Sequence, residues 1–130
     1  QSVGANVTFV YVDMGTEHKT WGYPSEDCKI QAKQIYSSQL ADQVLSTGKQ
    51  FDLILVDGRF RVACCLKSFS CLDENAVVLF DDFDARTYYH VVLKYYDILE
   101  TGKQMFALTK KVSAQPPSSE EIQKFETDAR

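Results

Sequence analysis

The sequence predicts an α/β fold in which parallel strands end in an antiparallel hairpin, and three observations support it. Two short apolar runs, 51–56 and 76–80, are rich in Val, Ile and Leu, which is typical of buried parallel strands. One helix-length segment, 59–75, separates them and makes a βαβ unit. Two alternating segments, 97–100 and 105–109, flank a Gly-containing turn and predict a hairpin. A chain of 130 residues makes one modest domain.

The N-terminal third adds a strand, a loop and a helix. Val7–Val12 is β-branched and aromatic, which predicts a strand that ends at Asp13-Met14-Gly15. A long polar loop follows over 16–28, and we expect Trp21 to anchor it to the body of the protein. The helical period then predicts a helix over 30–45, with a break near Ser37-Ser38 and a stop at Gly48.

The C-terminal half follows the same logic. The helix after the first aspartate-ended strand runs over 60–71 and buries one apolar face. A short helix over 87–95 precedes the hairpin, and its tyrosines are expected to pack rather than bind a ligand. We divide the chain into a partial α/β domain, 1–111, and a polar tail, 112–130, whose solvated helix over 120–128 is capped by Ser118 or Ser119.

Composition excludes several classes of function. The net charge of −4, without a basic block longer than two lysines, argues against nucleic-acid and anionic-membrane partners. No apolar stretch reaches membrane-spanning length and no secretory signal is visible, so we expect a cytoplasmic protein. The four cysteines have neither metal-site nor disulfide-framework spacing, which predicts buried or half-buried free thiols.

Three carboxylates follow the two buried strands. Asp57 ends the first strand in Val-Asp-Gly, and Asp81 and Asp82 end the second in Phe-Asp-Asp-Phe. In a βαβ unit both strands point the same way, so their carboxyl ends meet at one edge of the sheet. Open α/β sheets bind ligands at that edge. A structural alternative stays open for each residue, because aspartate after a strand also caps a helix or starts a turn.

These strand ends, in this order, resemble the C-terminal half of a class I S-adenosylmethionine-dependent methyltransferase. The local match over 51–83 is to metal-dependent O-methyltransferases of the catechol and caffeoyl-CoA type and to macrocin-type sugar O-methyltransferases. The resemblance implies that Asp57, Asp81 and Asp82 hold a metal, with Asp57 also near the cofactor. Mg²⁺ prefers such oxygen ligands and would lower the pKa of an acceptor hydroxyl.

The chain departs from this family on the cofactor side. No Gly-x-Gly follows a strand, and Val7–Val12 aligns with the family's third strand, so the first two strands have no counterpart. Because the chain also begins at Gln1, we expect a fragment of a longer protein. A partial sheet exposes its edges, which predicts a homodimer formed through them. By the resemblance, Asp13 and Gly15 would flank the adenine of S-adenosylmethionine, although Asp-x-Gly is also an ordinary turn.

Other residues have a functional and a structural interpretation. Arg59 and Arg61 lie just past Asp57 and suit bidentate contact with an anionic acceptor, or they neutralise the neighbouring aspartates. His90 follows the second strand and is a candidate general base, or a half-packed helix residue.

Three functions compete. The first is S-adenosylmethionine-dependent methyl transfer to a hydroxyl of a small molecule or sugar, performed as part of a longer protein. The second is a non-catalytic methyltransferase-like domain that self-associates or binds a partner. The third is a receiver-like doubly wound domain, which we rank last because it lacks an early Asp-Asp pair and a Lys after a late strand.

Overall fold

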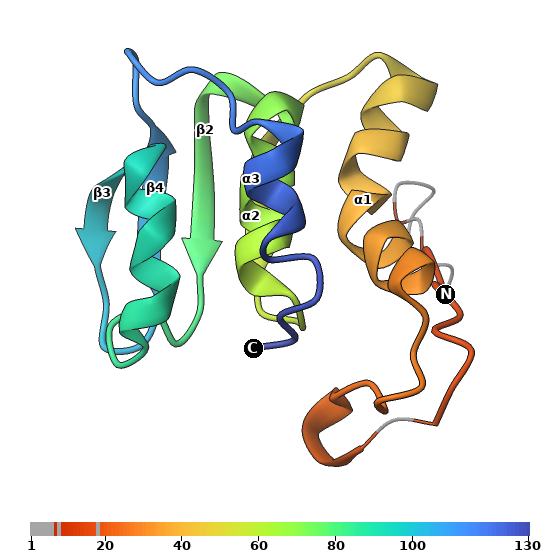
Figure 1. The fold of residues 1–130 in the computed structure, drawn as a ribbon. Helices are drawn as coiled ribbons and strands as arrows, with labels where there is room; N and C mark the ends of the chain where they lie inside the picture. The colour runs from red at the N-terminus through yellow and green to blue at the C-terminus, as the bar shows by residue number, and fades with distance from the viewer. Residues whose placement is uncertain (1–6, 8, 18) are drawn as a thin grey trace, which may run out of the picture.

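The computed structural model describes residues 7, 9–17 and 19–130, and in them one four-stranded sheet. In space the strands have the order β1-β2-β4-β3. β1 pairs with β2 in parallel, whereas β2–β4 and β4–β3 are antiparallel, which confirms both the parallel unit and the C-terminal hairpin. Figure 1 shows β2, β4 and β3 side by side. Their bounds are Phe51–Val56 for β1, Leu72–Phe80 for β2, Tyr96–Thr101 for β3 and Phe106–Lys110 for β4.

The helical segments of the C-terminal half lie over one face of this sheet, and the long helix Ile30–Thr47 stands beside them and packs on the helix Arg61–Ser68 (Figure 1). Alternate strand residues on that face, such as Ile54, Val78 and Leu108, are buried in the main core. The 3-10 segments are η1 (Thr20–Gly22), η2 (Phe69–Cys71) and η3 (Thr87–Lys94). The α-helices are α1 (Ile30–Thr47), α2 (Arg61–Ser68) and α3 (Ser119–Gln123).

Two boundaries differ from the prediction for local reasons. α1 continues unbroken through Ser37 and Ser38, whose hydroxyls donate to carbonyls one turn earlier and so do not compete for the backbone N–H groups of the helix. It ends at Gly48, whose φ of 68° gives the left-handed cap that the sequence predicts. β2 begins at Leu72 rather than Ala76, and the predicted turn becomes an irregularity inside the strand, where Asn75 donates its N–H to the Asp73 carboxylate.

The predicted strand over Val7–Val12 is wrong. Residue 7 and residues 9–12 have no strand conformation, and Phe9 and Tyr11 are 93% and 83% exposed. β-propensity stabilises a strand only when a partner completes the ladder, and in the described sheet these residues do not pair with β1, whose one neighbour there is β2. Thr8, in the middle of that segment, and His18, expected in the following loop, lie outside the described residues.

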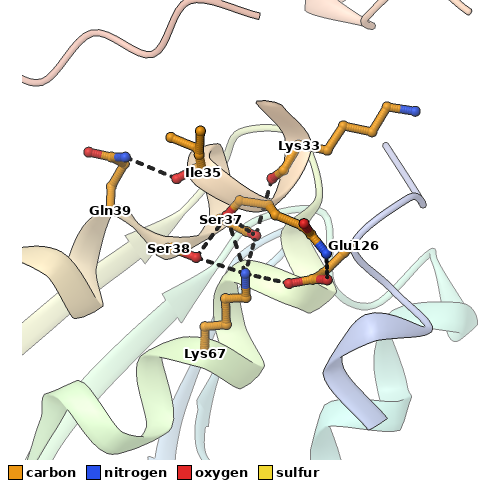
Figure 2. A network of polar contacts seen from close by, with 8 residues as sticks. Lys33, Ile35, Ser37, Ser38, Gln39, Lys67 and Glu126 are labelled. Atoms are coloured by element: carbon orange, nitrogen blue, oxygen red, sulfur yellow. Dashed lines mark hydrogen bonds and ion pairs between the residues drawn. The ribbon is translucent and has the colours of Figure 1, made fainter. Parts of the chain in front are cut away.

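The C-terminal segment packs onto the helical layer instead of lying in solvent. Ser118 caps α3 by accepting the N–H of Glu121, as predicted. Beyond the helix, Phe125 contacts the core and Glu126 is buried. Glu126 pairs with Lys67 of α2, whose ammonium also donates to hydroxyls of α1 (Figure 2). One polar cluster therefore joins α1, α2 and the chain end.

The face opposite the helices is left open by the described residues. Leu53 and Leu55 of β1 are 56% and 57% exposed there, beside their half-buried partners Val77 and Leu79 of β2. All four cysteines are free thiols, three buried and one half-buried, as predicted. Within the part of the chain that the structure describes, no helix combines the length and apolar character needed to cross a bilayer.

Candidate functional site

The three aspartates meet at the carboxyl edge of β1 and β2. Asp57 directly follows β1, and Asp81 and Asp82 directly follow β2. The N–H of Asp81 donates to the carbonyl of Val56, with a nitrogen–oxygen distance of 3.1 Å, which joins the two strand ends. We refer to Asp57, Asp81 and Asp82 as the carboxylate cluster. The sequence therefore places these side chains together correctly.

Arg61, in the first turn of α2, points into the carboxylate cluster. Its side chain is 4% exposed, and its Nη atoms lie 3.4 Å from Asp57 Oδ1, 3.7 Å from Asp81 Oδ2 and 3.3 Å from Asp82 Oδ2. It also donates to the carbonyls of Gly58, at 3.0 Å, and Asp81, at 2.8 Å. Arg86, which directly precedes η3, adds a second cation, 3.0 Å from Asp82 Oδ2. The structure thus assigns Arg61 the neutralising position that the sequence offered as its alternative.

The electrostatics of the cluster make one carboxylate a better proton acceptor than an isolated aspartate. The pKa of Asp81 is raised above its usual value, first by desolvation and then by the neighbouring Asp57 and Asp82 carboxylates. Three carboxylates against the two guanidiniums of Arg61 and Arg86 leave one excess negative charge. A carboxyl in this setting takes up or holds a proton more readily than an isolated surface aspartate.

A hollow of about 560 Å³ opens beside the carboxylate cluster. Arg59 lines it with its guanidinium stacked 4.4 Å from the ring centre of Tyr23. The described residues give Arg59 no carboxylate at ion-pair distance, so its charge is available to a ligand. Trp21 lines the same hollow and is 86% exposed, so the prediction that it anchors the loop is wrong.

Strained backbone gathers around this hollow. Trp21, Phe60 and Asp82 are the non-glycine residues with positive φ in the described ranges, at 62°, 55° and 58°. The left-handed conformation costs about 1 kcal/mol or more for such residues and persists where surrounding contacts enforce it. Two of the three line the hollow, and Phe60 begins the turn into α2. Strain of this kind concentrates at binding sites, which supports this hollow as the candidate functional site.

Two sequence-predicted sites lie elsewhere. His90 stacks on Phe83, and its Nε2 lies 3.0 Å from the Phe83 carbonyl oxygen rather than at the hollow. Asp13 accepts the N–H of Gly15 within its own turn, at 2.8 Å. Asp13 and Gly15 line a cavity of about 250 Å³ against α1, and Asp57 is not among its lining residues. The residues expected to contact the cofactor are therefore not brought together in one cavity.

The carboxylate cluster fits a magnesium ion poorly. Mg²⁺ needs free carboxylate oxygens in a near-octahedral arrangement, and here a guanidinium already lies among them. Across residues 7, 9–17 and 19–130, no group of three or more His, Cys, Asp or Glu side chains has a metal-holding arrangement. Magnesium binding stays a prediction of the family resemblance.

Comparison with known proteins supports the fold. No family model matches the sequence, and no curated protein matches it. The crystal structure of a methyltransferase-like protein from Silicibacter pomeroyi DSS-3 superposes with a TM-score of 0.73 at 26% sequence identity. The match covers 92% of this chain and 60% of that one, so this chain spans less than two thirds of its neighbour. The chain has a methyltransferase-like α/β fold.

Sequence reasoning missed two further contributors to the site. Arg86 pairs with Asp82 four residues earlier, and that spacing was the available signal. The second contributor, Arg130, has no comparable spacing in the sequence that would predict its contacts. The carbonyl of Arg130 accepts the N–H of Arg61 at 3.3 Å, and its guanidinium lies 4.4 Å from the ring centre of Tyr88. The last residue of the chain therefore supports the arginine at the centre of the cluster.

Proposed function

We propose that this chain forms the acceptor-binding side of an S-adenosylmethionine-dependent methyltransferase that acts on a hydroxyl of a small molecule or sugar. The observation that carries the proposal is the hollow at the carboxyl edge of a methyltransferase-like sheet, where carboxylates and an available arginine meet. The cofactor side would come from a longer protein, because Asp13 and Gly15, which the resemblance places at the adenine, line a different cavity from Asp57.

The acceptor in this proposal carries an anionic group. Arg59 offers a planar guanidinium suited to a carboxylate or phosphate, and Tyr23 holds it in place from one side. Trp21 and Tyr23 supply aromatic faces that would contact the body of the acceptor. The acceptor hydroxyl would then lie toward the carboxylate cluster, where Asp81 has a raised pKa and can accept a proton.

Binding is measurable through the single tryptophan of the chain, because Trp21 lines the hollow. We expect sugar phosphates and hydroxy acids to change its fluorescence, and Arg59→Met to weaken their binding about tenfold or more, the worth of a charge-assisted pair. Lys103→Met, a change at an exposed turn, is the matched control and should leave binding unchanged. Neutral sugars that bind as tightly as their phosphates would contradict the role of Arg59.

Activity tests the proposal as a whole. We expect methyl transfer from labelled S-adenosylmethionine to a hydroxyl acceptor in the longer protein, with this chain alone showing little cofactor affinity by calorimetry. Absence of transfer in both forms, across anionic and neutral acceptors, would favour the non-catalytic alternative. One observation supports that alternative: among the residues that the structure describes, none pairs with the outer edge of β1.

A further inference from the structure

Arg61 is held in the carboxylate cluster by more than its ion pairs. Its Nε donates to the Gly58 carbonyl and its Nη1 to the Asp81 carbonyl, at 3.0 and 2.8 Å. Its guanidinium lies 5.7 Å from the ring centre of the buried Tyr89. A guanidinium with five fixed donors matches such a set of acceptors and loses little freedom when it binds them. The side chain of Arg61 is therefore held in one position at the carboxyl edge of the sheet.

The position of this guanidinium competes with a metal ion. It contacts one oxygen each of Asp57, Asp81 and Asp82, so these oxygens are not free to bind a divalent cation. Arg61 is 4% exposed, and displacing it would break its hydrogen bonds to the carbonyls of Gly58 and Asp81 and leave those acceptors without their donor. A cation placed beside it would meet direct charge repulsion instead.

We infer that Arg61 occupies the position of a metal ion at the carboxyl edge of β1 and β2, so that Asp57, Asp81 and Asp82 bind a guanidinium in place of a divalent ion. Any chemistry at the rim then proceeds without a metal. The inference concerns the cluster itself and stands whether or not the proposed methyl transfer occurs. It also separates this rim from the metal-dependent methyltransferases that the sequence resembles.

Manganese binding tests the inference without any assay of activity. We expect calorimetry to find no saturable Mn²⁺ site in the wild-type chain. Arg61→Met frees the carboxylate oxygens and should create a site that binds Mn²⁺ about tenfold or more tightly than wild type, because one nearby positive charge is removed. Mn²⁺ should raise the melting temperature of this variant, and adding Asp81→Asn should abolish both effects. Arg59→Met, at the neighbouring arginine without a carboxylate partner, should behave as wild type.

Each outcome decides the inference. A saturable Mn²⁺ site in the wild type that Asp81→Asn removes would overturn it. A folded Arg61→Met variant that binds no Mn²⁺ would overturn it too, because the three carboxylates would then be unable to bind a divalent ion even without the guanidinium. If Arg61→Met does not fold, Arg61→Gln takes its place, since an amide can still donate to the carbonyls of Gly58 and Asp81. Should neither fold, the wild-type measurement with its Asp81→Asn control decides alone.

Discussion

Gly58 shows how one residue shapes the rim. It follows Asp57 in the turn from β1 to α2, and its φ is not positive, so conformational freedom does not explain the glycine. A Cβ at this position would lie 2.6 Å from the hydroxyl oxygen of Tyr36, which crosses from α1. The close approach of Tyr36 to the backbone favours glycine, because a Cβ would force the tyrosine ring to shift, and both residues border cavities beside Asp57.

We expect Gly58→Ala to destabilise the protein by about 1 kcal/mol, because the added methyl group forces the Tyr36 ring aside. Removing the hydroxyl with Tyr36→Phe should recover most of that loss, and urea denaturation of the four variants measures the coupling. Gly102→Ala is the control. Its Cβ would meet the backbone oxygen of Met105 at 2.7 Å, so its loss of stability should not depend on the Tyr36 hydroxyl. An equal loss for Gly58→Ala with and without the Tyr36 hydroxyl would contradict this account.

At the residue scale, the sequence predicts which groups share an edge but not how each is used. Asp57, Asp81 and Asp82 meet because strand direction alone determines where parallel strands end. The burial of Arg61 depends on Tyr89 and on the chain end, which are distant in sequence. No local pattern predicts such contacts, which is why Arg59 and Arg61 looked equivalent in the sequence and differ in the structure.

Three elements are joined by a single polar cluster around Lys67 (Figure 2). The ammonium of Lys67 lies 2.8 and 2.9 Å from the hydroxyls of Ser37 and Ser38 and pairs with Glu126, which also accepts from Gln34. The side chains of Lys67 and Glu126 are 14% and 7% exposed. Burial alone would raise the pKa of Glu126, but hydrogen bonds from Lys67 and Gln34 outweigh it and lower the pKa.

We expect Glu126→Gln to lower the free energy of unfolding by about 3 kcal/mol at pH 7, since it leaves a buried ammonium without its partner. Because the folded pKa of Glu126 is lowered, its stabilising effect is complete above its unfolded pKa of about 4.3 and is lost as pH falls through the folded pKa. The difference from wild type should therefore shrink in acid, as urea denaturation from pH 7 to 3 measures. Glu74→Gln, at an exposed carboxylate, serves as control. A pH-independent loss would contradict the role of the charge.

At the element scale, the apolar period predicts α1 and α2 but hides what joins them. Ser37 and Ser38 suggest a helix break in the sequence. In the structure their hydroxyl oxygens accept hydrogen bonds from the ammonium of Lys67. The tail looks solvated because its composition is polar, yet Phe125 and Glu126 reach the core layer. Composition predicts exposure on average, and a few well-placed side chains are enough to dock a polar segment.

The two edges of the sheet differ in how they meet solvent. β3 carries Asp97 and Glu100 and an irregularity between Ile98 and Glu100, features that discourage strand addition. β1 presents the exposed Leu53 and Leu55 beside a cavity of about 430 Å³. The sequence predicts an open edge because the first two strands of the family that it resembles have no counterpart in this chain. It does not predict that residues 7 and 9–12 stay out of the described sheet, since β-propensity carries no information about partners.

Self-association through β1 is the prediction at the scale of the whole molecule. A second copy can extend the sheet along this edge, which no described strand occupies, and cover part of Leu53 and Leu55 in the same step. Leu55→Lys should raise the dissociation constant of the dimer about tenfold or more, because a charge replaces buried apolar area. Sedimentation velocity over a range of concentrations measures this.

Leu99→Lys is the matched control, because Leu99 has similar exposure, 59%, but lies on β3. If the dimer uses β1, Leu99→Lys should associate as the wild type does. A wild-type chain that stays monomeric at high concentration would refute self-association. Equal weakening by both substitutions would show instead that association is unspecific, driven by apolar surface rather than by the β1 edge. A selective effect of Leu55→Lys identifies the edge at which the described sheet is open as its interaction surface.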